Sequence, residues 1–89
     1  MTDVKELYLK GLSLYGQGRH AEAIEAFRGA LAVAPERADC LQALAMAQMH
    51  AGRLQEALES VLKLTSATPE DPQAFTSLSM IYQRLDRIE

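Results

Sequence analysis

The chain has 89 residues, 48% of them hydrophobic, which suits a single small domain. Its 9 basic and 12 acidic residues are interspersed and give a net charge of −3, so no basic stripe is available for the phosphates of a nucleic acid. No apolar run approaches the roughly 20 residues that cross a bilayer, no secretory signal opens the chain, and Cys40 has no second cysteine with which to form a disulfide. We therefore expect a cytoplasmic protein that binds neither nucleic acid nor membrane.

The spacing of the apolar residues predicts helices joined by short turns, and no segment shows the alternation of a strand. Segments that are apolar on most sides alternate with amphipathic ones, as expected for helices that pack in pairs. The chain is therefore predicted to be all-α. The expected helices are about Val4–Gly16, His20–Ala34, Arg37–Ala51, Leu54–Ala67 and Pro72–Leu85.

Capping and turn residues define the ends of these helices. Asp3 and Glu6 have the spacing of a capping box at the start of the first helix. The glycines in the turn that follows permit a positive φ where that helix ends. Asp71 followed by Pro72 predicts an N-cap and a first helical residue, because proline lacks an N–H that would be unpaired at that position.

Two stretches of the chain match each other at a single fixed offset. Residues 52–69 overlie residues 18–35 with glycine, arginine, alanine and proline all in register. One fixed period that holds such residues indicates a repeat architecture and not a closed globule. The identical pairs are Gly18/Gly52, Arg19/Arg53, Glu22/Glu56, Ala23/Ala57, Glu25/Glu59 and Pro35/Pro69.

The period and pattern resemble those of the tetratricopeptide repeat, a helix–turn–helix unit. The resemblance covers essentially the whole chain, 1–89, as one domain with repeats at about 4–37 and 38–71 and the leading helix of a third at 72–89. It implies a right-handed superhelix of helical hairpins whose concave face is lined by the first helix of each unit. The matching residues are Leu7, Gly11, Leu14, Ala23, Phe27, Ala30 and Pro35, then Leu41, Leu44, Ala45, Ala57 and Pro69, then Phe75, Leu78, Ser79 and Tyr82.

Small residues in each unit allow neighbouring backbones to approach closely. Gly11, Ala45 and Ser79 occupy one such position on the first helices, and Ala23 and Ala57 occupy another on the second helices. A larger side chain at these places would overpack the contact, at a cost of roughly 1–3 kcal/mol. The departures from the family pattern, which affect local packing, are Lys10, Gln48, Val61 and Leu64.

No residue pattern indicates catalysis or a bound metal, so we predict neither enzymatic activity nor a cofactor. His20 and His50 are far apart in sequence and near turns, which is typical of surface histidines and not of a shared metal site. Cys40 is expected to behave as a small buried hydrophobe, because no histidine lies near it in sequence to activate the thiol.

The resemblance assigns a set of positions to the concave groove. Where some family members grip the terminal carboxylate of a peptide with lysine, asparagine and arginine, this chain has Tyr8, Leu12, Ala43, Gln73 and Ser77. We instead predict an apolar groove, since methionine adapts to irregular apolar ligands; packing of the same residues between helices is the alternative that the sequence leaves open. The predicted lining residues are Tyr8, Leu12, Tyr15, Met46, Met49 and Met80, and the other groove positions include Lys5, Asp39, Gln42, Gln73, Thr76 and Gln83.

The leading functional hypothesis is a protein-interaction module that binds an apolar or amphipathic segment of a partner protein or peptide. The alternative is a self-assembly element that forms a homodimer or larger homo-oligomer through its last helix. A solenoid end without a neighbour exposes apolar surface, which a second copy can cover about a two-fold axis. A chain trimmed from a longer repeat array would expose the same surface. The residues predicted for self-association are Leu78, Ile81, Tyr82 and Leu85.

Overall fold

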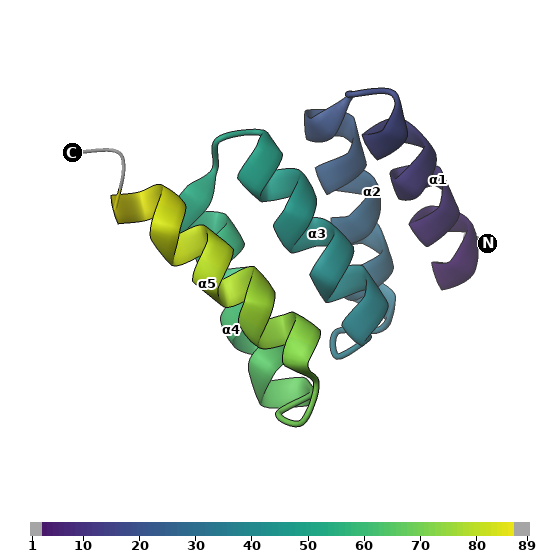
Figure 1. Cartoon of the computed structure of the whole chain (residues 1–89). Helices are drawn as coiled ribbons and strands as arrows, with labels where there is room; N and C mark the ends of the chain where they lie inside the picture. Colours follow the sequence, from purple (N-terminus) through teal and green to yellow (C-terminus); the bar gives the residue numbers. More distant parts are fainter. Residues whose placement is uncertain (1–2, 87–89) are drawn as a thin grey trace.

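The computed structural model describes residues 3–86, which form five helices and, within that range, no strand. They form two antiparallel hairpins and a fifth helix in a curved array (Figure 1) that measures 43 × 29 × 17 Å. The prediction of an all-α helical-hairpin repeat is confirmed. The helices are α1 Val4–Gly16, α2 His20–Val33, α3 Ala38–His50, α4 Leu54–Ala67 and α5 Pro72–Asp86.

The turn inside each hairpin uses one glycine in the left-handed region. Gly18 has a φ of 79° and Gly52 a φ of 80°, and they are the matching residues of the two units. Glycine adopts this conformation without the steric cost that a Cβ brings. The predicted ends of the helices agree with the observed ones to within one residue. The match with residues 52–55 predicts that residues 86–89 begin a following element. Asp86 is instead the last residue of α5, and residues 87–89 lie outside the described residues.

The two predicted helix starts differ in outcome. Asp71 caps α5 as predicted, because its Oδ1 accepts a hydrogen bond of 2.9 Å from the backbone N–H of Gln73. Asp3 occupies the N-cap position of α1 with an extended backbone, but its side chain makes no capping hydrogen bond. The predicted capping box with Glu6 is therefore wrong. The spacing of the two residues permits the box, but the side chains do not adopt it.

The close approach of α1 and α2 is centred on Gly11. A Cβ built on Gly11 would lie 2.6 Å from Cδ1 of the Phe27 ring, so only glycine leaves room for that ring. Phe27 is fully buried and belongs to a cluster with Ile24 of α2 and Leu44 of α3. The core therefore continues from the first hairpin into the second and does not stop at the boundary between units.

The second hairpin contains a buried polar pair where the first hairpin has Leu14 and Ala26. The Ser60 hydroxyl of α4 donates a 2.7 Å hydrogen bond to Oε1 of Gln48 on α3. Both side chains are buried. A satisfied pair of this kind is tolerated in a core, whereas either partner alone would leave a buried polar group unpaired.

We predict opposite effects of alanine at two glycines of α1. Gly11→Ala should destabilise the fold by about 1–3 kcal/mol, because the buried Phe27 ring cannot move away. Gly16→Ala should leave stability unchanged or raise it by up to ~1 kcal/mol, because no heavy atom lies within 4 Å of its added Cβ. Urea unfolding followed by circular dichroism measures both. Equal stabilities of the two variants would contradict this account of the α1–α2 contact.

Candidate partner-binding groove

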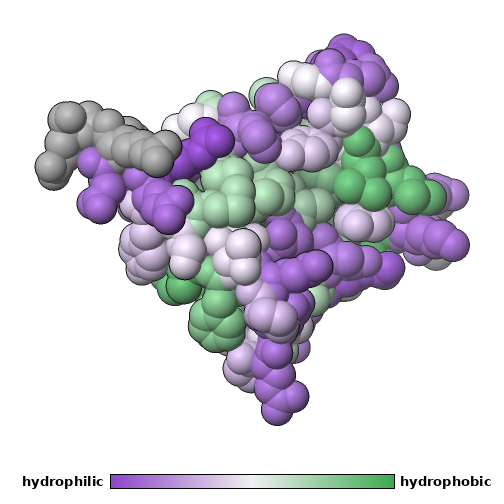
Figure 2. Space-filling model, in the orientation of Figure 1, coloured by the Kyte–Doolittle hydropathy of each residue, from purple (hydrophilic) through white to green (hydrophobic). Residues whose placement is uncertain are grey.

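Helices α1, α3 and α5 form one layer of the array, since α3 contacts both of the others. Helices α2 and α4 lie behind this layer, each antiparallel to the helix with which it forms a hairpin (Figure 1). The face of the first layer therefore carries the positions that the sequence assigns to the groove. In the orientation of Figure 2, a band of hydrophobic surface crosses the middle of this face and is bordered by hydrophilic surface.

The structure separates the six residues predicted to line the groove. Leu12 and Met80 are 37% and 38% exposed, and three others, Tyr8, Tyr15 and Met46, are partly buried. Met49 is 2% exposed and belongs to the core cluster of the second hairpin. Its predicted exposure is wrong, because α3 is surrounded by α2, α4 and α5 and is apolar on nearly every side. Periodicity alone could not tell which of its methionines faces outwards.

Tyr8 and Leu12 of α1 line a cavity of about 460 Å³ at one end of the groove. Its opposite wall comes from the start of α3, and its floor includes Leu64 of α4. Asp71 also lines this cavity. The sequence identified it only as a helix cap, and its local pattern does not indicate that it shares a cavity with residues of α1. The remaining lining residues are Ala38, Asp39, Gln42, Ala43 and Gln73.

Polar contacts hold the α3 side of this cavity. Nε of Arg37 donates a 2.8 Å hydrogen bond to Oδ1 of Asp39, and the same oxygen accepts the backbone N–H of Cys40. Partial burial raises the pKa of the Asp39 carboxyl, but Arg37 and the Cys40 amide outweigh burial, so that the net shift is downwards. Nε2 of Gln42 donates a 2.8 Å hydrogen bond to Oγ of Ser77 on α5. Asp39 is thus held as a carboxylate, and Gln42 is fixed between α3 and α5.

Tyr8 connects this cavity to the core of the first hairpin. Its ring lies 6.1 Å from the Phe27 ring between centroids, at a tilt of 49°. Partial burial, followed by the negative charge of Asp39, raises the pKa of the Tyr8 phenol. The phenol is therefore a neutral hydrogen-bonding group at the edge of the apolar wall.

Tyr15 lies apart from this cavity, in an aromatic cluster with the two histidines. His20 and His50 stack with ring centroids 5.6 Å apart, and Tyr15 lies 5.5 and 5.7 Å from them. Sequence reasoning missed this contact, because the histidines belong to different units and meet only when α2 and α3 pack. No group of three or more histidine, cysteine or acidic residues among residues 3–86 is arranged to hold a metal ion.

The residues predicted for self-association also divide between two faces of α5. Ile81 is fully buried in the core cluster of the second hairpin, against which Leu78 and Leu85 also pack. The prediction that Ile81 is exposed is therefore wrong: its side of α5 faces the α3–α4 hairpin. An adjoining side of α5 carries Tyr82, 50% exposed, and Phe75, 47% exposed.

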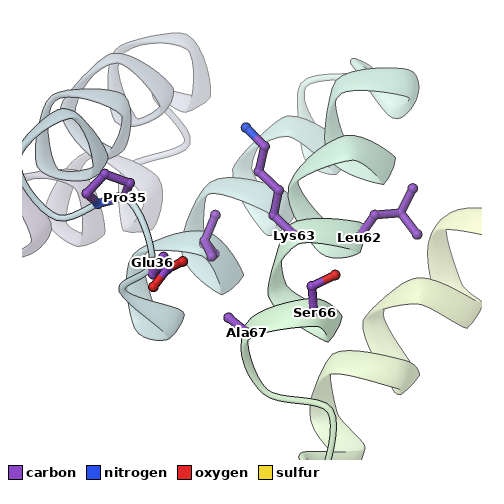
Figure 3. A pocket seen from close by; sticks show the side chains of 7 residues that line it. Pro35, Glu36, Leu62, Lys63, Ser66 and Ala67 are labelled. Carbon is purple, nitrogen blue, oxygen red and sulfur yellow. The ribbon is translucent and has the colours of Figure 1, made fainter.

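A second cavity, of about 540 Å³, lies between the α2–α3 turn and α4, and shares no residue with the groove. Figure 3 shows Pro35 and Glu36 on the turn side and Lys63 and Ala67 on the α4 side. The Lys63 side chain extends away from Glu36, so the charged groups do not converge on a common point. No helix within the described range is long and apolar enough to cross a membrane.

The model of the tetratricopeptide repeat family matches residues 14–81, which is most of the chain. The chain belongs to the tetratricopeptide repeat family. Repeats of this family generally mediate contacts between proteins. The matched range begins in the last turn of α1, contains all of α2, α3 and α4, and ends within α5.

Several proteins that contain tetratricopeptide repeats are similar to the chain. A repeat-containing thioredoxin, TTL4 of Arabidopsis thaliana, is 30% identical over 89 residues, which are 100% of this chain and 13% of that protein. The photosystem I assembly protein Ycf3 of Synechococcus sp. (strain CC9605) is 30% identical over 84 residues, covering 91% of this chain and 49% of Ycf3. Ycf3 of strain CC9311 is 30% identical over 83 residues, covering 90% and 48%. The chain thus spans half or less of the length of these relatives.

We predict that Cys40 is unreactive in the folded repeat protein. Burial raises the pKa of its thiol from 9.0 to about 11, with a further contribution from Asp39. Its thiolate fraction at mildly alkaline pH, and with it the rate of alkylation by iodoacetamide, should fall about a hundredfold below that of the unfolded chain. Alkylation with and without denaturant, followed by mass spectrometry, measures the ratio. Equal rates would place the thiol at the surface.

Proposed function

We propose that this chain is a protein-interaction module whose groove, formed by α1, α3 and α5, binds an apolar or amphipathic segment of a partner protein. The observation that carries the proposal is a row of apolar side chains on the three helices. Leu12, Met46 and Met80 occupy the same position in successive units. Leu12 and Met80 are exposed and Met46 is half-buried.

The chemistry of this row suits a segment that presents apolar side chains at intervals. Methionine is unbranched and polarizable, so its side chain adapts to irregular apolar surfaces. Amphipathic helices and extended segments both bind in grooves by inserting such anchors. The row supplies contact area from three separate helices, and therefore favours a ligand that runs across the array.

The relatives support a binding role without specifying the partner. The name of Ycf3 connects that protein with the assembly of photosystem I, and a scaffold that holds other proteins during assembly is consistent with the groove proposed here. The thioredoxin relative matches over 13% of its own length. Because the present chain has a single cysteine, the dithiol chemistry of a thioredoxin has no counterpart in it. We therefore infer a non-catalytic module, and a cytoplasmic location is consistent with its free Cys40.

We predict that negative charge in the row weakens the binding of apolar peptides. The double variant Leu12→Glu, Met46→Glu should weaken binding of apolar peptides by about tenfold or more, because each peptide anchor would desolvate a carboxylate. Val33→Glu is the matched control, since Val33 is 63% exposed on α2 and lies outside the groove cavity. Peptide arrays and fluorescence anisotropy measure affinity, and circular dichroism checks folding. A folded double variant with the affinity of the control would rule out the groove.

Self-association through α5 is a second candidate, favoured by a specific observation. Phe75 and Tyr82 of α5 and Leu62 of α4 are each between 44% and 50% exposed. The two helices pack against each other, and a contiguous patch of exposed apolar side chains marks an interface. The contact would therefore be formed by Tyr82 with Phe75 and Leu62, with Leu78 and Leu85 at its edge, and not by the buried Ile81.

We predict that Phe75→Lys with Tyr82→Lys leaves the chain monomeric at concentrations where the wild type self-associates. Paired lysines repel their symmetry mates and are too exposed to disturb the core. Val33→Lys, at an exposed apolar residue on a different helix, serves as the control and should self-associate as the wild type does. Sedimentation over a concentration series measures the mass. A wild type that stays monomeric at high concentration would eliminate this candidate.

A further inference from the structure

The cavity at the end of the groove combines apolar walls with two acidic side chains. Tyr8, Leu12 and Leu64 form apolar wall and floor, whereas Asp39 and Asp71 approach from the starts of α3 and α5. No basic residue is among its lining residues. A volume of about 460 Å³ is within the range of sites that accept a large side chain or a small ligand.

The two carboxylates differ in how their charge is balanced. Asp39 forms an ion pair with Arg37, and Arg37 does not itself line the cavity. Asp71 makes no ion pair with any residue in 3–86, and its Oδ1 accepts a hydrogen bond from the backbone N–H of Gln73. The register of the repeat shows the contrast: Asp71 occupies the position that Arg37 holds one unit earlier. The cavity therefore has an excess of negative charge where the previous unit has a cation.

We propose that the groove binds a segment carrying a lysine or arginine, whose basic side chain enters this cavity between Asp39 and Asp71. The proposal rests on the proposed function and names the chemistry of the partner. The aliphatic stem of the basic residue packs along the exposed side chain of Leu12, as long charged side chains do on apolar surfaces. Its cationic head meets Asp71, which still has an oxygen to accept a charge-assisted hydrogen bond. The Tyr8 ring adds a face to which a cation is attracted.

Charge complementarity favours this occupant over the other two kinds of segment. A purely apolar segment would take water from the Asp71 carboxylate without replacing its hydrogen bonds, which is costly. An acidic segment would add a like charge beside both aspartates. A basic residue flanked by apolar ones satisfies the cavity and leaves its neighbours free to contact Met46 and Met80.

The test compares peptides that differ only at a central residue. Short peptides with randomised leucine, alanine and phenylalanine flanks carry arginine, citrulline or glutamate at the centre, and binding to the chain is measured by fluorescence anisotropy. Citrulline keeps the shape of arginine without its charge. We expect arginine peptides to bind about tenfold or more tighter than citrulline peptides, the range for a hydrogen bond to a charged group. Added salt should reduce that ratio.

The double variant Asp39→Asn, Asp71→Asn should remove the preference and leave the binding of citrulline peptides unchanged. Asparagine keeps the cap of α5 and an acceptor for the Cys40 amide, so folding is preserved. Glu70→Gln, an exposed neighbour outside the cavity, should keep the full preference.

Two results separate this inference from the proposed function. If arginine and citrulline peptides bind equally and Leu12→Glu with Met46→Glu abolishes both, the groove is right and the basic residue is wrong. If no peptide binds, whatever its centre, both proposals fail. A preference for arginine that survives in the double asparagine variant would place the basic residue elsewhere, and would overturn the inference.

Discussion

The ring of Phe27 occupies the space that a side chain on Gly11 would need, and the positions of the other helices depend on that contact. Because α1 and α2 approach closely there, Phe27 also reaches Leu44 and Ala47 of α3 and joins the two hairpins into one core. Tyr8, which lines the cavity at the end of the groove, packs against the same Phe27 ring, with 6.1 Å between the ring centroids. The close contact at Gly11 therefore supports one wall of a cavity of which that glycine is not part.

The second hairpin reaches the same geometry with different side chains. Ala45 takes the place of Gly11 and Val61 that of Phe27, and both are fully buried. The shorter reach of valine is accompanied by the hydrogen bond between Ser60 and Gln48, which links α4 to α3 at 2.7 Å. The two units are thus equivalent in backbone but not in chemistry. A buried polar pair also fixes the register of two helices, since any shift would leave both groups unpaired.

The fixed period of the repeat made the fold predictable, because glycine, alanine and proline recur where backbone geometry demands them. The groove was less predictable. Helix α3 is apolar on nearly all sides, so its sequence could not show that Met49 points into the core while Met46 lies closer to the surface. Ile81 was misjudged for a different reason: its exposure was predicted from the lack of a following neighbour, whereas it packs against the α3–α4 hairpin. Contacts between units leave no local signal in the sequence. Such contacts form the cluster of Tyr15, His20 and His50 and place Asp71 in the lining of the groove cavity.

The outer surface of the array changes character between its units. Arg28 of α2 forms an ion pair with Glu56 of α4, with 3.1 Å between nitrogen and oxygen, so the outer contact between these two helices is polar. That ion pair is exposed and contributes little to stability. The corresponding residue of α4 is Leu62, which is 44% exposed and points towards α5 (Figure 3). At this position α4 contacts a charged residue of α2. A molecule that packed beside α4 would instead contact an apolar residue, Leu62. The two second helices therefore differ in the surface they present: α2 offers a cation to its neighbour, and α4 offers an exposed leucine at the same position.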